Sequence, residues 1–157
     1  MDNNALLRQQ LTNFLIGSEA HMSLRDAVKD FPMQHSNDIF PNGTYSFWQL
    51  LEHIRITQRD IIEFMINPRY KELSWPQEYW PKNTVQATPE KWRRTVNAYE
   101  DDLQEVKNLV ENKDTHLFDH VPSGSGQTFL REVLLLMDHT AYHVGEFGIM
   151  RQVLKLW

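Results

Sequence analysis

The sequence contains no cysteine. This absence excludes disulfide bonds, thiolate metal ligands and a cysteine nucleophile. A metal ion held by the side chains of this protein would therefore need histidine, aspartate or glutamate ligands. Seven histidines and 21 acidic residues are available among the 157 residues.

The sequence also lacks long apolar runs and clusters of basic residues. No apolar run reaches the about 18 residues that a membrane span needs, and the N-terminus has no signal-peptide pattern. The net charge is −5, so we expect neither a nucleic-acid partner nor a membrane partner. We expect a cytoplasmic protein with a single domain over residues 1–157, because 41% of these residues are hydrophobic and 24% are charged.

Strand patterns, internal repeats and low-complexity tracts are missing as well. Instead, four segments have the periodicity of amphipathic helices, and each follows residues that cap helices. These segments are residues 5–20 after Asn3 or Asn4, 47–66 after Thr44 or Ser46, 89–111 after Thr88, and the C-terminal stretch after Gln127 or Thr128. Connections rich in proline, glycine and asparagine separate them. The fold class expected is all-α, an antiparallel four-helix bundle with long connecting loops.

The C-terminal stretch, QTFLREVLLLMDHTAYHVGEFGIMRQVLKLW, carries two histidines four residues apart. On a helix, His139 and His143 lie on one face about one turn apart, where two imidazoles can share one metal ion. The opposite face carries an apolar stripe. Its members are Leu130, Leu134, Met137, Ala141, Val144 and Gly148. The histidine face is also partly apolar, so we expect a central helix with protein on both sides.

A third imidazole is available from His53, in the middle of the predicted helix 47–66 and just off its apolar stripe. Three neutral imidazoles would leave an open position on a metal, as a catalytic site requires. Periodicity alone equally allows histidines that lie in the core and are satisfied by neighbouring hydrogen bonds. The spacing is weak evidence by itself, because His116 and His120 share it in a segment without helical pattern. We expect these two histidines to be surface or loop residues.

The fragments SFWQLLEHIRITQRDIIEF and LLLMDHTAYHVGEFGIMRQVL resemble the DinB / YfiT-like superfamily of metal-binding four-helix bundles. The shared pattern is a histidine in the middle of the second helix and His-x-x-x-His in the fourth. The resemblance implies His53, His139 and His143 as ligands of one divalent transition metal, zinc or nickel, in a homodimer. Some members of this superfamily transfer thiols such as bacillithiol, mycothiol or glutathione, one branch isomerises maleylpyruvate, and many have no known reaction.

The resemblance therefore implies a metal-dependent enzyme that activates water or a low-molecular-weight thiol, with hydrolase or thiol S-transferase chemistry on a small-molecule substrate. The alternative is a non-catalytic bundle, a small-molecule binder or interaction protein whose metal is structural or absent. An open coordination position favours the enzyme. A position closed by Glu146 favours the alternative.

Four further features near the predicted site leave alternatives open. Glu146 stands where related chains commonly have glutamine, and it can be a further ligand, an anchor for a ligand imidazole or a base. His21, at the end of the first predicted helix, can contact the substrate or cap that helix end. Asp60 can orient a ligand imidazole or remain a solvated charge. Tyr142 and the aromatic loop WPQEYWP are assigned to packing rather than to substrate contacts.

Overall fold

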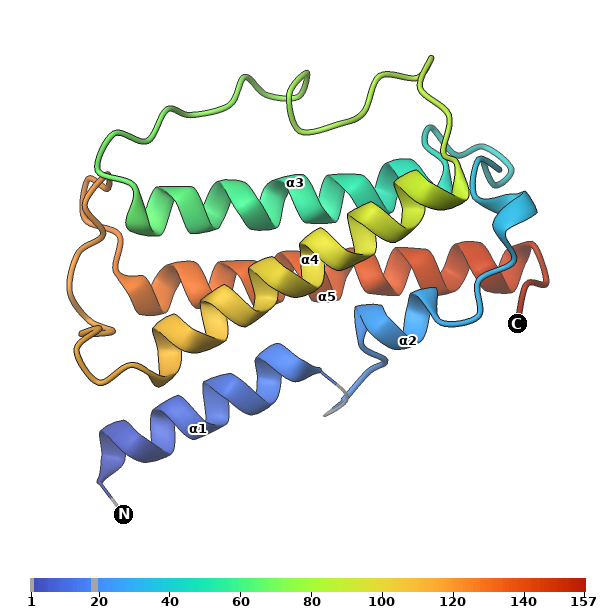
Figure 1. The fold of residues 1–157 in the computed structure, drawn as a ribbon. Coiled ribbons are helices and arrows are strands. Elements are labelled where there is room, and N and C mark those ends of the chain that lie inside the picture. The colour runs from blue at the N-terminus through green and yellow to red at the C-terminus, as the bar shows by residue number, and fades with distance from the viewer. Residues whose placement is uncertain (1, 18–19) are drawn as a thin grey trace.

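The computed structural model describes residues 2–17 and 20–157, and its regular structure is helical (Figure 1). The elements are α1 (Asn3–Ile16), α2 (Leu24–Val28), the 3₁₀ helix η1 (Met33–His35), α3 (Phe47–Ile66), α4 (Pro89–Glu111) and α5 (Phe129–Val153). Within the described ranges, extended pairing is limited to two isolated bridges. The expected all-α bundle is confirmed. Among the helices described, none combines the length and the apolar character that crossing a bilayer demands.

The four long helices form a ring of neighbours. Both α1 and α3 pack against α4 and α5. Figure 1 shows that α3 and α5 run in opposite directions, as do α1 and α4. The connection 67–88 crosses back over the length of α3, so that α4 starts beside the start of α3 and runs parallel to it. A short loop would have made these two helices antiparallel. The long connection is therefore also a cover for one side of α3.

Local capping explains why three of the predicted helices begin where they do. Ser46 accepts a hydrogen bond from the backbone of Gln49 while the Gln49 side chain accepts one from the backbone of Ser46. The Thr88 hydroxyl caps α4, with proline at its first position, and the Thr128 hydroxyl caps α5. The predicted ranges 47–66 and 89–111 are confirmed residue for residue.

The prediction for the first helix was wrong at both ends. Asp2, rather than Asn3 or Asn4, caps α1. The helix ends at Ile16 instead of continuing to residue 20, because Gly17 takes φ 81°, a backbone conformation that favours glycine. A Cβ at Gly17 would also lie 2.9 Å from the Cβ of Ser23, where the chain turns back into α2. Residues 18 and 19 of the predicted helix lie outside the described residues.

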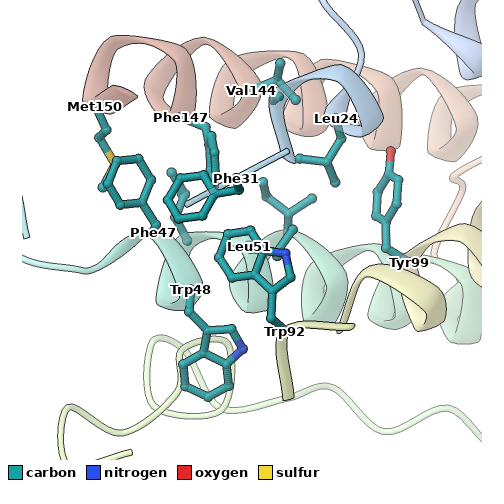
Figure 2. Close-up of a cluster of buried hydrophobic side chains, with 13 residues drawn as sticks. Leu24, Phe31, Phe47, Trp48, Leu51, Trp92, Tyr99, Val144, Phe147 and Met150 are labelled. Atoms are coloured by element: carbon teal, nitrogen blue, oxygen red, sulfur yellow. The ribbon is translucent and has the colours of Figure 1, made fainter. Parts of the chain in front are cut away.

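An aromatic core lies between α3, α4 and α5 at the end where α2 packs (Figure 2). Phe31, which follows α2, stacks on Trp92 at a centroid distance of 4.7 Å and meets Phe47 at 4.8 Å. Phe147 closes the cluster from α5 at 5.1 Å from Phe47. This rigid packing of large side chains holds α5 against α3 next to the histidines of both helices.

The apolar stripe predicted for the last helix is not its most buried side. Leu134 is 49% exposed, whereas Leu136, Phe147 and Met150, on the side of the histidines, are at most 2% exposed. The reason is that α1 ends early and α2 is short. The predicted stripe therefore faces a cavity of about 960 Å³ between α1, α2, α4 and α5. α5 nevertheless contacts α3 as well as α1 and α2, as expected for a central helix.

Candidate metal centre

Three histidines from two helices converge on one point between α3 and α5. The Nε2 atom of His53 lies 3.2 Å from Nε2 of His143 and 3.2 Å from Nε2 of His139. One nitrogen from each ring lies within 4.8 Å of the other two, a grouping that could hold a metal ion. His139 and His143 share a face of α5 because four residues separate them, and the antiparallel packing of α3 brings His53 opposite that face.

The hydrogen-bond partners fix which nitrogen of two rings carries the proton. Nδ1 of His53 lies 2.8 Å from the carbonyl oxygen of Tyr79, which can only accept, so Nδ1–H of His53 donates. Nδ1 of His143 lies 2.6 Å from Oε2 of Glu146, and this ring likewise donates from Nδ1. With both Nδ1 atoms engaged, the Nε2 atoms of His53 and His143 face each other at 3.2 Å. They are the ring nitrogens left to bind a shared cation.

Burial keeps the imidazoles of His53 and His139 neutral. Desolvation, with a smaller contribution from the neighbouring His143, lowers the pKa of His53 to about 4 against the opposing effects of the Tyr79 carbonyl and Glu146. Desolvation likewise lowers the pKa of His139 to about 3, with contributions from His143 and His53. Neutral imidazole is the form that ligates metals, and the three converging ring nitrogens could hold a metal ion.

Glu146 lies behind His143, on the side of the ring away from the three Nε2 atoms. Its contact with Nδ1 is the arrangement in which a carboxylate orients a ligand imidazole and increases its basicity. Tyr45 lies beside the same carboxylate. Burial, together with Glu146, raises the pKa of Tyr45 to about 12, so this phenol remains protonated there.

The connection 67–88 forms the other wall of the site. Trp80 stacks on His53 with a centroid distance of 3.8 Å and an angle of 6°, and Tyr45 stacks on Trp80 at 4.8 Å. Together with the Tyr79 carbonyl, these aromatic rings hold the His53 ring in place. Neither Tyr79 nor Tyr45 was predicted as part of the site. For Tyr79, the signal available in the sequence was the density of aromatic residues in the connection 67–88, which indicated that these rings cover another part of the protein.

Asp60 contacts this loop rather than a histidine. Its two carboxylate oxygens accept hydrogen bonds from the hydroxyls of Tyr70, at 2.9 Å, and Tyr79, at 2.6 Å. Burial raises the pKa of both tyrosines above its usual range, and the bond to Asp60 raises it further, so both hydroxyls remain donors. Both roles predicted for Asp60, a direct partner of an imidazole and a solvated charge, were therefore wrong.

Two aromatic residues assigned to packing are in fact exposed beside the histidines. The side chain of Trp75 is 68% exposed, with its ring 6.5 Å from that of His53. Tyr142 is 65% exposed, and its ring lies 4.9 Å from that of His143. The packing assignment was correct for Trp80 and wrong for these two residues.

The other histidines lie elsewhere. His21 lines the cavity behind α5, and its Nδ1–H donates to the carbonyl oxygen of Met22 at 2.8 Å. Because α1 ends at Ile16, His21 does not cap that helix. His116 and His120 are exposed in a non-helical segment, as predicted, and Nδ1–H of His120 donates to the carbonyl of Gly126.

Comparison with known proteins gives one family. The family model described as the DinB superfamily matches residues 18–147, a range that includes all three converging histidines. No curated protein and no solved structure shows a match.

Proposed function

Because this chain belongs to the DinB superfamily, we propose that it is a metal-dependent enzyme in which His53, His139 and His143 hold one divalent transition metal. The observation that carries the proposal is the convergence of three ring nitrogens: Nε2 of His53 lies 3.2 Å from Nε2 of His143 and from Nε2 of His139. Nδ1 of His53 and Nδ1 of His143 are engaged by other groups, so their Nε2 atoms remain to bind one cation.

The residues around the histidines favour catalysis over a purely structural metal. Glu146 is engaged with Nδ1 of His143, so three protein ligands remain and a position is open. A divalent metal at such a site lowers the pKa of a water molecule or thiol that it holds. Trp80 covers one face of His53 and excludes water from it, while Glu146 and the Tyr79 carbonyl keep the two Nε2 atoms directed inward.

We propose hydrolysis or transfer of a low-molecular-weight thiol as the reaction, with a small-molecule substrate, because both reactions need the same three nitrogen ligands. The exposed ring of Trp75 beside the site offers apolar surface to such a substrate.

The proposal predicts one zinc or nickel ion per chain in purified protein reconstituted with either metal, because three imidazole nitrogens converge at one point. Elemental analysis measures the stoichiometry, and anomalous scattering at the metal edge locates the ion. Parallel assays of the loaded protein with ester substrates and with thiol acceptors would distinguish hydrolysis from thiol transfer. An ion located away from the three histidines would contradict the assignment.

We also propose that the chain forms a homodimer. One face of α5 carries exposed apolar side chains with no helix of the same chain packed over them, within the part of the chain that the structure describes. These are Tyr142, Ile149 and Val153, which are 50–65% exposed. Burying such a face is favourable at about 25 cal/mol per Å². Sedimentation equilibrium at micromolar concentration is expected to give twice the chain mass of 18.7 kDa. A monomer would contradict this prediction.

A further inference from the structure

One face of α3 binds the connection 67–88 at three places, and His53 is the middle one. Gln49 donates to the side chain of Asn83 at 3.0 Å, four residues before His53 along the helix. His53 donates to the Tyr79 carbonyl. Asp60, seven residues after His53, accepts from the hydroxyls of Tyr70 and Tyr79. The loop is therefore held on both sides of the point where it touches the candidate metal ligand.

Tyr79 connects the two contacts on the C-terminal side. Its backbone carbonyl binds His53 and its hydroxyl binds Asp60. His53 and Asp60 are seven residues apart, which corresponds to about two turns of α3, or about 10.5 Å. Tyr79 therefore extends along the helix, with its carbonyl at His53 and its hydroxyl at Asp60. Moving the Tyr79 hydroxyl away from Asp60 would also release the restraint on its carbonyl.

The partners of Asp60 differ from those of the other carboxylates on the same helix. Glu52 pairs with Arg55, and Glu63 pairs with Arg59. Asp60 uses both oxygens on neutral phenols that belong to the loop. Tyr70 is further fixed by an edge-on contact with Phe64, at 5.3 Å and 73°. The half-buried carboxylate thus joins two loop residues to α3 instead of neutralising a nearby cation.

We propose that Asp60 is a positioning residue for the three-histidine site, which acts through Tyr79. By holding the Tyr79 hydroxyl, Asp60 keeps the Tyr79 carbonyl on Nδ1–H of His53 and so leaves Nε2 of His53 free as a ligand. The functional meaning of this role rests on the proposed metal site, whereas the chain of hydrogen bonds is a property of the protein itself. Removing a group that orients a ligand imidazole typically weakens metal affinity by about 10–100-fold.

The test compares Asp60→Ala and the milder Tyr79→Phe with the wild-type protein. Tyr79→Phe removes the hydroxyl and keeps the backbone carbonyl and the ring. Glu105→Gln is the control, because it neutralises a carboxylate whose partner is Arg59 and leaves the loop untouched. Zinc affinity is measured by competition with a chelator. In the metal-free protein, imidazole ¹⁵N shifts report which nitrogen of His53 carries the proton.

We expect Asp60→Ala and Tyr79→Phe to weaken zinc affinity similarly, each by up to about 10–100-fold, because both remove the contact between Asp60 and the Tyr79 hydroxyl. In both variants, the metal-free His53 should change from the Nδ1–H form to a mixture of tautomers, while Glu105→Gln changes neither measurement. Unchanged zinc affinity and tautomer in both variants would overturn the inference, as would a loss of affinity without a change of tautomer. If the wild-type protein binds no zinc or nickel, the proposed function fails, and the tautomer measurement still decides the role of Asp60.

Discussion

Replacing His53 with alanine is expected to weaken zinc binding by more than about 100-fold, beyond the loss typical of a residue that only orients a ligand. The side chain is 2% exposed, and its Nε2 lies 3.2 Å from the Nε2 atoms of both other histidines. Without it, two imidazoles on one face of α5 remain. His139→Ala and His143→Ala should have comparable effects, because each also removes one of three converging nitrogens. Chelator competition, with elemental analysis of the dialysed variants, measures the loss.

The matched controls are His116→Ala and His120→Ala. These two residues have the same spacing as His139 and His143, but they are exposed and non-helical. We expect both control variants to retain the metal as the wild-type protein does. Circular dichroism of the metal-free variants establishes that each is still helical, since His53 also stacks on Trp80 and its removal loses that packing. Equal metal loss in the two sets would refute the three-histidine site.

Replacing Glu146 with glutamine is expected to weaken metal binding by about 10–100-fold with almost no change of shape. The carboxylate accepts from Nδ1–H of His143 at 2.6 Å, and its charge increases the basicity of the opposite nitrogen. A neutral amide accepts more weakly, and its NH₂ group can turn towards Nδ1 and favour the wrong tautomer. Activity should return when metal is added in excess, because the carboxylate lies on the far side of the ring from the ligand atoms.

Two other outcomes would give Glu146 a different role. Intact metal affinity with activity lost by about 10²–10⁴-fold would identify a base, which the geometry disfavours. Unchanged metal affinity and unchanged activity would show that the contact between Glu146 and His143 contributes to neither. Asp138→Asn is the control, because it neutralises an exposed carboxylate next to His139 on the same helix, on the side of the cavity. It should bind metal as the wild-type protein does.

Much of the local structure was predictable from the sequence. The ranges of α3 and α4 followed from Ser46, from the Thr88-Pro89 pair and from the helical periodicity. The spacing of His139 and His143 was sufficient to place them on one face. These signals act within one or two turns of helix, where hydrogen bonds and steric preferences join residues close in sequence. The mid-helix position of His53, off the apolar stripe, made it the candidate for the third member of the group, and the DinB resemblance implied the same residue.

Other features depended on how the helices pack. At Gly17, directly after the end of α1, the approach of Ser23 leaves no room for a Cβ. The cavity between α1, α2, α4 and α5 decided which side of α5 is buried. The partners of Asp60 and the exposure of Tyr142 followed likewise from tertiary contacts.

The sequence by itself determined the helical segments, the shared face of His139 and His143, and the lack of any thiolate ligand. Tertiary structure alone decided that Nε2 of His53 lies beside the Nε2 atoms of His139 and His143, which follow it in the sequence by 86 and 90 residues. It also decided that a backbone carbonyl 26 residues from His53 fixes the tautomer of that ring. Every residue has a backbone carbonyl, so the sequence does not indicate which carbonyl will contact the His53 ring. Its role arises only because the connection 67–88 crosses back over α3 and places Tyr79 on His53.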